Sequence, residues 1–434
     1  MKPNTSQIVL LGGGYVSIWA YRSLVKKLRF EISRGLIQII VVCPEEFHCF
    51  HGWTAESLTC IIQDQNRMSC LSELMPYAQI LKGQAEKIDP LANEIYIRKP
   101  SGSIQMIHYD HLLIGTGSVD RCNVKGLDKY GFQIKSHEAF LHTREKLIHL
   151  VNRASLESKD IAQEVLSITI AGSGFSGVEL ATNIAEFLKN LIRKYPSLHD
   201  LQPRIRLVNS ENKLLNVLKP QLHRMRSYTE NIMKSYGIEI INNNKIFEVT
   251  SEGLFLNDAA FIKCSMVISA IGQSPLILNG TEEMQRDPGN RILLNKYLQV
   301  NNHSNIWGGG DACHVENYKS KEVSPPNALW AIKHGEYAGR NIANAISMKR
   351  LKSFDYMGLG QCASLGVGKG IGELYGFEFT GWVAWIMRWI FFNYFMPSRK
   401  VMFREVMDWM YLFLSGKRKG LRVKQEPTKF ITQS

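Results

Sequence analysis

The chain has 434 residues, of which 45% are hydrophobic and 21% charged, so it can form two or three domains with sizeable cores and is not a disordered chain. Its formal net charge of +13 fits nucleic acid or an anionic membrane surface, but no run of interleaved aromatic and basic residues resembles a nucleic-acid platform. The eight cysteines form no CxxC pair and no zinc-like spacing, which argues against a dithiol reductase, predicts no metal site and favours the reducing cytoplasm.

The first predicted unit is a strand at 8–11, a turn with Gly12 and Gly14, and a helix that we expect to end near Leu28. In this context, backbone N–H groups at the helix N-terminus bind a pyrophosphate. Ser17 stands where the third glycine of the fingerprint is expected, which relaxes the close packing of helix on strand. We predict that Gly12, Gly14 and Ser17 contribute to a dinucleotide site.

A second and complete copy of the same pattern begins at the apolar run 168–171. Gly172 allows the tight turn, Gly174 lets the backbone approach phosphate, and Gly177 lets the following helix pack on the strand. We expect that helix at 178–194. Two such turns in one chain predict two dinucleotides, which is the minimum for a flavin reduced by a nicotinamide.

Neither copy has the acidic residue that usually holds a ribose at the end of the second strand. The first of these strands, 37–42, runs into Cys43, and the second, 204–208, runs into Asn209. The Asn209 amide is predicted to bind a ribose. Because no carboxylate repels a 2′-phosphate, the sequence leaves the choice between NADH and NADPH open.

Three further turns follow predicted strands. Thr116 and Gly117 follow the strand at 107–114, Gly272 follows a later apolar run, and Asp311 follows a strand and three glycines. A carboxylate at such a turn can accept a hydrogen bond from a polyol chain. The alternative for Asp311 is an ordinary turn residue that caps the next helix.

These motifs, taken in order over nearly the whole chain, resemble the flavoproteins with two dinucleotide sites, which include pyridine-nucleotide–disulfide reductases and type II NADH dehydrogenases. The residues that carry the resemblance are the two glycine turns, Tyr109-Asp110, Gly115-Thr116-Gly117, Glu179, Gly272, Pro275 and Gly310-Asp311. The resemblance implies that the first turn binds the ADP part of FAD and that the second binds NAD(P)H. It also implies that Asp311 contacts the ribityl chain.

The implied fold is α/β, with two Rossmann-like dinucleotide-binding domains, for FAD and NAD(P)H, and a C-terminal amphipathic helical segment on a membrane surface. The FAD domain is expected at 1–120 and again at 288–350, and the NAD(P)H domain at 121–287. Residues 351–434 are expected to form a flavin-capping and membrane-attachment region.

Within the family, the C-terminal third is most similar to type II NADH dehydrogenases, which are NADH:quinone oxidoreductases. The matching segments are 354–356, 360–366, 381–385 and Asp408-Trp409. One departure concerns the quinone-side motif of that subgroup. Where the subgroup has three glutamines, this chain has Leu329, Lys333 and His334. The electron acceptor is therefore less well defined by the sequence than the fold.

Three residues are candidates for a catalytic role. Glu179, in the first turn of the second helix, is the candidate polar group near the nicotinamide. The alternative for Glu179 is a helix-surface or capping carboxylate. Lys333 and His334 are candidates to stabilise an anionic reduced flavin or to protonate the acceptor, and the alternative is a solvated helix face.

The C-terminal runs 382–396 and 401–414 are apolar, but charged residues interrupt both, so they are too short to cross a bilayer. Aromatic and basic residues at helical spacing suit helices that lie in the membrane interface. Basic residues after Lys417 add attraction to anionic lipid of roughly 1 kcal/mol each. We expect 382–424 to attach the protein to the inner face of the plasma membrane. The alternative is a helix pair docked in the core or in a homodimer interface.

The predicted function is an FAD-dependent NAD(P)H dehydrogenase, in which hydride passes from NAD(P)H to flavin and electrons pass to a membrane quinone-like acceptor. One alternative is a flavoprotein like sulfide:quinone oxidoreductases, with redox cysteines drawn from Cys122, Cys313 and Cys362. The other is a non-catalytic, membrane-associated nucleotide-binding protein.

Overall fold

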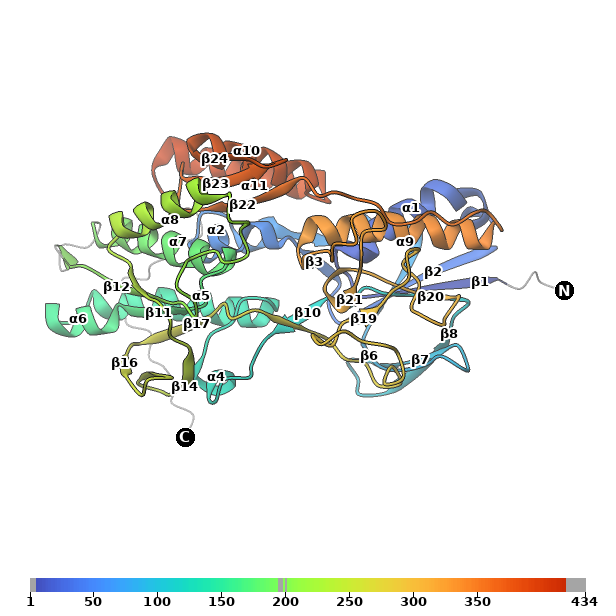
Figure 1. The fold of residues 1–434 in the computed structure, drawn as a ribbon, viewed down its shortest axis with the longest axis horizontal. Coiled ribbons are helices and arrows are strands. Elements are labelled where there is room, and N and C mark those ends of the chain that lie inside the picture. Colours follow the sequence, from blue (N-terminus) through green and yellow to red (C-terminus); the bar gives the residue numbers. More distant parts are fainter. Residues whose placement is uncertain (1–4, 194–197, 200, 419–434) are drawn as a thin grey trace. The chain divides into compact units, whose positions relative to one another are not determined.

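The computed structural model describes residues 5–193, 198–199 and 201–418, and the chain forms two compact units (Figure 1). The first unit consists of 1–51, 68–119 and 273–359. The second unit consists of 52–67, 120–272 and 360–434. The four-part domain division stays a prediction.

The core of the first unit is a five-stranded sheet of order β20-β9-β1-β2-β5 in which all neighbours are parallel. Its strands are β1 (Ser6–Leu11), β2 (Ile37–Cys43), β5 (Ala78–Lys82), β9 (His111–Ile114) and β20 (Ile306–Gly308). Apart from the edge strand β5, the strands are mostly buried apolar residues, as parallel strands covered on both faces require.

Helices α1 (Tyr15–Ser33) and α9 (Ala328–Ile346) pack side by side in the first unit (Figure 1). Gly335 and Gly339 of α9 make this approach possible, because a Cβ on either would lie 2.3 Å from a backbone oxygen of α1. The unit also contains α3 (Leu71–Leu74), η4 (Gly310–Ala312), β3 (Phe47–Cys49), β4 (Met68–Cys70), β6 (Gln84–Asp89), β7 (Glu94–Arg98), β8 (Ile104–His108), β18 (Gln273–Pro275), β19 (Ile292–Leu293) and β21 (Cys313–His314).

The second unit is built on a four-stranded parallel sheet of order β13-β12-β11-β17. These strands are β11 (Ser167–Ala171), β12 (Arg204–Val208), β13 (Glu239–Ile241) and β17 (Met266–Ser269). The helices of this part are α2 (Thr54–Leu58), α4 (Leu127–Tyr130), α5 (His137–Ala154), α6 (Lys159–Val165), α7 (Phe175–Ile192) and α8 (His223–Ser235). An antiparallel sheet of β14 (Ile246–Val249), β15 (Gly253–Leu256) and β16 (Phe261–Lys263) follows. The strand β10 (Ser118–Asp120) lies where the chain passes from the first unit into the second.

The C-terminal part of the second unit is an antiparallel sheet followed by two helices, drawn in orange and red in Figure 1. Its elements are β22 (Gly360–Ser364), β23 (Gly370–Leu374), β24 (Phe377–Gly381), α10 (Trp382–Phe395) and α11 (Arg399–Ser415). Gly370 lets α10 approach the sheet, because a Cβ there would lie 2.7 Å from the backbone nitrogen of Trp385. The Trp385 ring meets Trp409 of α11 edge to face, with centroids 5.1 Å apart.

The predicted α/β fold with two Rossmann-like sheets and C-terminal helices is confirmed. The first helix does not end at Leu28, however, but continues to Ser33. Leu28 is a kink inside it, with φ −123° and ψ 24°. In the part of the chain that the structure describes, we find no helix that is long and apolar enough to cross a membrane.

Candidate functional site

The first glycine turn leaves the N-terminus of α1 open. Gly14 precedes the helix in an extended conformation, no side chain caps it, and a Cβ on Gly14 would meet no atom within 4 Å. Gly12 has φ +93°, and a Cβ there would lie 2.5 Å from the Gly115 carbonyl oxygen. The helix N–H groups therefore face a space that suits an anion.

Ser17 fits at the third glycine position because its neighbour Gly115, directly after β9, is also small. Its side chain is fully buried, and its hydroxyl donates to the Leu11 carbonyl oxygen at 3.3 Å. A Cβ on Gly115 would lie only 3.0 Å from the Ser17 oxygen. The departure from the fingerprint at Ser17 is thus accommodated by Gly115.

Two further turns of the first unit carry polar groups suited to a polyol chain. The Thr116 hydroxyl is buried and has no hydrogen-bond partner among the described residues. Gly117 follows with φ +70°. Asp311, in η4, accepts a hydrogen bond of 2.7 Å from the Ser118 hydroxyl. An orphaned buried hydroxyl near such a carboxylate fits a bound ligand with several hydroxyl groups.

The second glycine turn has the same open geometry at the N-terminus of α7. Gly172 has φ +102°, and a Cβ there would lie 2.4 Å from the Ala270 oxygen. A Cβ on Gly177 would lie 1.8 Å from the Gly172 oxygen, whereas one on Gly174 would meet nothing within 4 Å. Because no side chain caps α7, its N–H groups are available to a second anion. The residues present fit the pyrophosphates of two dinucleotides.

Asn209 is not open to solvent. It is fully buried, its carbonyl oxygen accepts from the Ser173 hydroxyl at 2.5 Å and from the Glu211 N–H at 3.2 Å, and its amide donates to Asn242 at 2.7 Å. Asn209 therefore ties the second glycine turn to the end of β12, and its contact with a ribose stays a prediction. Gly272 has φ +106° at the end of the strand next to that turn.

Glu179 lies in a buried ion cluster that sequence reasoning missed. The Arg388 guanidinium of α10 pairs with Glu56 at 2.7 Å and with Glu179 at 3.1 Å, and it also donates to the Gly52 carbonyl oxygen. The Arg388 and Glu56 side chains are only 2% and 1% exposed, and that of Glu179 is 20% exposed. Glu179 also accepts a hydrogen bond of 2.7 Å from the Ser364 N–H.

This cluster brings the pKa of Glu179 close to neutral pH. Burial raises the pKa of Glu179 to about 7, with Arg388 opposing the rise and Glu56 adding to it. Burial alone would lower the pKa of Arg388, but the two carboxylates raise it, so the guanidinium stays charged. A partly exposed carboxyl group poised near pH 7 is suited to hold or release a proton.

Two more acids of α11 point into the second unit. Asp408 accepts hydrogen bonds from the Gln63 backbone and side chain, both at 2.9 Å, and from the Asn66 amide at 2.6 Å. Glu405 is fully buried, and burial raises its pKa to about 8, so its carboxyl group is neutral at pH 7. The charges that interrupt the C-terminal apolar runs at Arg388, Glu405 and Asp408 thus belong to the interior of the unit.

Lys333 and His334 differ in their surroundings on α9. His334 is 2% exposed, its Nδ1 accepts from the Gly310 N–H at 3.0 Å, and its Nε2 lies 3.1 Å from the Ser324 hydroxyl. Burial lowers the pKa of His334 to about 3, so the ring is neutral. Lys333 forms an ion pair of 2.9 Å with Glu336. Catalytic roles for both residues stay predictions.

His48 is a second residue that the sequence did not explain. Its Nδ1 lies 3.2 Å from the Gly13 carbonyl oxygen, and its ring packs edge to face on Tyr15. Burial lowers the pKa of His48 to about 4, so the neutral ring donates from Nδ1 and supports the first glycine turn. Gly13 lies 35 residues before His48, so no local pattern in the sequence indicates this contact.

The cysteines do not form a redox pair among the described residues, where all eight are free. Burial raises the pKa of Cys313 and of Cys362 to about 12, which keeps both as thiols. Cys122 is exposed. The described residues also contain no group of three or more histidine, cysteine or acidic side chains arranged for a metal ion.

Comparison with known proteins defines the family. Residues 6–335 match the family model described as pyridine nucleotide-disulphide oxidoreductase. The chain belongs to this family. This membership confirms the predicted family and the predicted enzyme class, an oxidoreductase built to bind a pyridine nucleotide.

Curated relatives are similar over most of their length. The chain is 25% identical over 347 residues to the probable NADH dehydrogenase of Dictyostelium discoideum, which covers 78% of this chain and 75% of the relative. It is 22% identical over 400 residues to the type II NADH:quinone oxidoreductase of Staphylococcus saprophyticus, which covers 89% and 94%. These names agree with the predicted dehydrogenase activity.

Solved structures share the fold. NDH2 from Plasmodium falciparum in complex with NADH superposes with a TM-score of 0.84 at 14% identity, over 96% of this chain and 100% of that chain. The sulfide:quinone oxidoreductase of Aquifex aeolicus superposes with a TM-score of 0.72 at 16% identity, over 96% of both chains. At these identities the similarity defines the fold alone.

Proposed function

We propose that this protein is an FAD-dependent NADH dehydrogenase that passes electrons to a quinone-like acceptor at a membrane surface. The observation that carries the proposal is the pair of uncapped glycine turns, one in each unit, at the N-termini of α1 and α7. The relatives named NADH dehydrogenase and type II NADH:quinone oxidoreductase support it.

The chain's own residues bind, orient and supply protons. A flavin held in the first unit would supply the two-electron redox chemistry that links a nicotinamide to an acceptor. The N–H groups after Gly14 would hold the FAD pyrophosphate, and those after Gly174 would hold that of the nicotinamide nucleotide. Thr116 and Asp311 would bind hydroxyl groups of the flavin chain. Neutral His334 fixes the Gly310 N–H and thereby positions the Asp311 turn.

Glu179 is the proposed proton-holding group. Two-electron reduction of a quinone consumes two protons, and a carboxyl group with a pKa of about 7 exchanges protons readily at neutral pH. Arg388 holds the Glu179 carboxylate in place at 3.1 Å and is itself fixed by Glu56. We assign Arg388 and Glu56 a positioning role.

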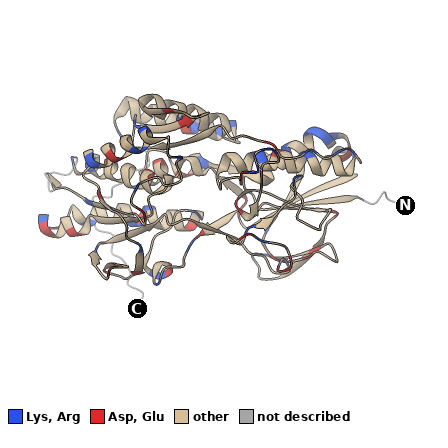
Figure 2. Ribbon diagram, in the orientation of Figure 1, with Lys and Arg blue, Asp and Glu red and all other residues tan. Residues whose placement is uncertain are grey.

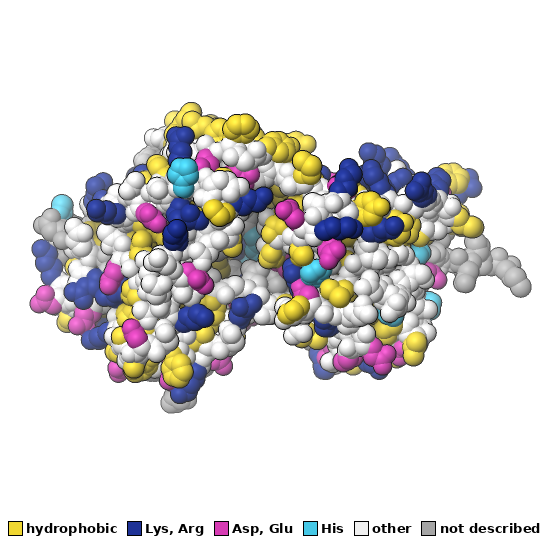
Figure 3. Space-filling model, viewed as in Figure 1, with side chains coloured by type: hydrophobic (Ala, Val, Ile, Leu, Met, Phe, Trp, Pro, Cys, Tyr) yellow, Lys and Arg dark blue, Asp and Glu magenta, His cyan; other side chains and the backbone are white. Residues whose placement is uncertain are grey.

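Attachment to a membrane surface is proposed from the exposed apolar face of α10 and α11. Figure 3 shows hydrophobic side chains gathered over these helices. The large exposed members are Trp382, Val383, Ile390, Tyr394, Phe403, Met407, Met410, Tyr411, Phe413 and Leu414. An apolar face of this kind suits the interface of a bilayer, and the same face offers the alternative of a homodimer contact.

The basic residues are less concentrated at the C-terminus than the sequence indicated. Exposed basic side chains also line α1 in the first unit (Figure 2), at Arg22, Lys26, Lys27 and Arg29. Arg418, which falls in the predicted basic tail, is instead buried against Glu186. The remaining tail charges, Lys419, Arg422 and Lys424, lie outside the described residues. Binding to anionic lipid at the inner face of the plasma membrane therefore stays part of the proposal.

The test is steady-state reduction of a short-chain quinone by NADH, with NADPH as the comparison donor, across pH 5.5 to 9. We expect turnover to follow a group that titrates near pH 7, and Glu179→Gln to lower turnover and remove that dependence. Absence of NADH-dependent quinone reduction would contradict the proposal. An unchanged pH profile in E179Q would contradict the role of Glu179.

The sulfide:quinone alternative is tested by replacing Cys122 and Cys362 together with serine. Because Cys362 is a buried thiol and the glycine turn for a nicotinamide is complete, we expect NADH oxidation to stay intact in the double variant. Loss of activity in a variant that is still folded would favour cysteine chemistry instead.

A further inference from the structure

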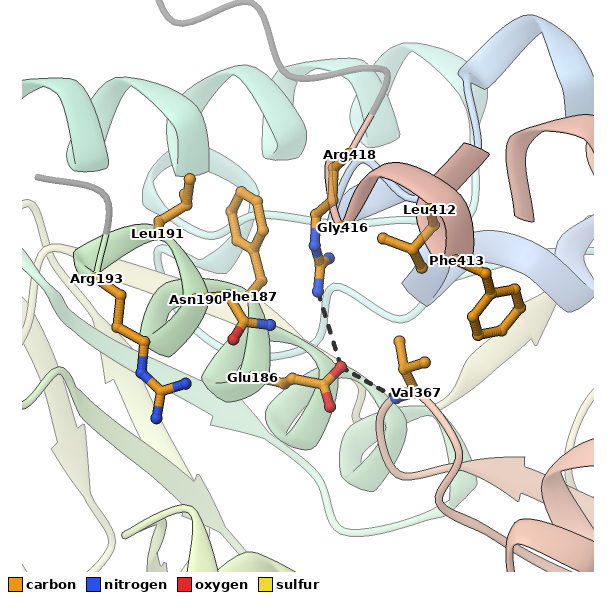
Figure 4. A pocket seen from close by; sticks show the side chains of 10 residues that line it. All are labelled: Glu186, Phe187, Asn190, Leu191, Arg193, Val367, Leu412, Phe413, Gly416 and Arg418. Carbon is orange, nitrogen blue, oxygen red and sulfur yellow. Dashed lines mark hydrogen bonds and ion pairs between the residues drawn. The ribbon is translucent and has the colours of Figure 1, made fainter. Parts of the chain in front are cut away.

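A cavity of about 460 Å³ lies within the second unit, between the C-terminal half of α7 and the end of α11 (Figure 4). This volume is typical of small-molecule sites. Its lining residues from α7 are Glu186, Phe187, Asn190, Leu191 and the adjoining Arg193. At a rise of 1.5 Å per residue, Glu186 lies about 10 Å along α7 from Glu179. The cavity is thus separate from the buried ion cluster.

The one acidic side chain of the cavity is fully compensated. One oxygen of Glu186 accepts from the Tyr236 hydroxyl at 3.0 Å and lies 3.5 Å from the Lys369 ammonium. The other accepts from the Val367 N–H at 3.0 Å and pairs with Arg418 at 3.7 Å, as the dashed lines in Figure 4 mark. Glu186 therefore leaves no free negative charge to repel an anion.

Positive charge and hydrogen-bond donors remain available on one side. Arg193 is exposed and forms no ion pair with any residue that the structure describes, and Asn190 lies one turn before it. Arg418 is held inside the unit, since it donates to the Thr59 carbonyl oxygen at 2.5 Å and lies 5.1 Å from the Phe187 ring. A cavity with this excess of guanidinium groups favours an anion.

The rest of the lining is apolar and is continuous with the exposed face of α11. Phe187 and Leu191 come from α7, and Leu412 and Phe413 from α11. Phe413 is 60% exposed, and the next residue, Leu414, is 83% exposed. A ligand that satisfies both parts of the cavity has an anionic end and a hydrocarbon end.

We propose that this cavity binds one acidic phospholipid, with its phosphate at Arg193 and Asn190 and its acyl chain against Leu191, Leu412 and Phe413. The chain's own residues 419–434 suit the cavity less well, because they include four basic residues and one acidic residue. The proposed membrane attachment identifies the source of the lipid, whereas binding itself depends neither on attachment nor on catalysis.

The test is isothermal titration of the full-length protein, without NADH or quinone, with dihexanoyl phosphatidylglycerol below its micellar concentration. Dihexanoyl phosphatidylcholine and inorganic phosphate are the comparison ligands. We expect one saturable site for phosphatidylglycerol and much weaker binding of either comparison ligand. Arg193→Gln should weaken binding by at least about fivefold, the effect of one basic group on an anionic lipid. Leu412→Trp, which fills the cavity, should abolish it.

Arg224→Gln is the matched control, because Arg224 is another exposed arginine of the second unit and does not line the cavity. Its affinity should equal that of the unchanged protein. Equal binding of both lipids, binding of phosphate alone, or no effect of R193Q and L412W would each overturn the proposal. Failure of this titration would leave NADH-dependent quinone reduction unaffected, so the two proposals fail separately.

Discussion

Loss of the buried Arg388 should strongly destabilise the second unit. In Arg388→Met, two acidic side chains that now share one guanidinium, Glu56 and Glu179, are left without a cation. The existing rise in the pKa of Glu179 from 4.5 to about 7 already corresponds to about 3 kcal/mol in favour of its neutral form. Breaking a buried ion pair costs about 3–5 kcal/mol, so we expect a loss of that size at pH 8.

The pH dependence of this loss separates charge from packing. An acid whose pKa is raised in the folded state destabilises the fold as the pH rises above the pKa of that acid in the unfolded chain. The loss of unfolding free energy in R388M should therefore be small near pH 5.5 and largest near pH 8. The free energy of unfolding in urea, followed by tryptophan fluorescence, measures it at both pH values.

Two controls complete the experiment. Glu56→Gln combined with R388M removes one of the stranded charges and should recover part of the stability. Lys263→Met breaks the fully exposed pair with Glu164 and should change little. A loss in R388M that is equal at both pH values, or below about 1 kcal/mol, would refute the reasoning about the buried cluster.

Three other substitutions give separate tests. Gly174→Ala should fold normally but raise the KM for NADH at least tenfold. Gly177→Ala should also lower thermal stability, because its Cβ would overlap a backbone oxygen at 1.8 Å. Equal effects of the two variants on thermal stability would contradict the turn geometry. Glu405→Gln should remove the decline in stability between about pH 5 and pH 8 that a buried acid with a pKa raised from 4.5 to about 8 causes, as urea unfolding measures. Trp382→Ser should reduce co-sedimentation with vesicles at least about tenfold, from roughly 1.5–3 kcal/mol of lost burial, whereas Met348→Ser, at an even more exposed apolar residue outside α10 and α11, should not.

The sequence was sufficient for the local features of the fold. Gly12 and Gly172 stand at positive φ where a side chain would strike a neighbouring strand, so their spacing encodes the turns directly. Gly177 is equally determined, because any Cβ would overlap the Gly172 oxygen. By contrast, the space that accommodates Ser17 depends on Gly115, which lies 98 residues away directly after β9, and no local pattern indicates that pairing.

The sequence alone could not predict the partners of the buried charged residues. Arg388 interrupts an apolar run, which reads as the polar edge of an interfacial helix, but its partner Glu56 lies 332 residues away. Asp408 likewise binds Gln63 across 345 positions. A charge inside an apolar helix indicates either a polar face or a buried partner, and only the tertiary structure distinguishes the two.

The central claim is a flavin that NADH reduces and a quinone reoxidises, and an anaerobic visible spectrum of the purified protein tests it most directly. We predict a flavin band that bleaches when NADH is added and returns when a short-chain quinone follows. A flavin band that does not change when NADH is added would indicate another electron donor, such as sulfide. A protein without flavin would contradict the claim and leave only a nucleotide-binding fold.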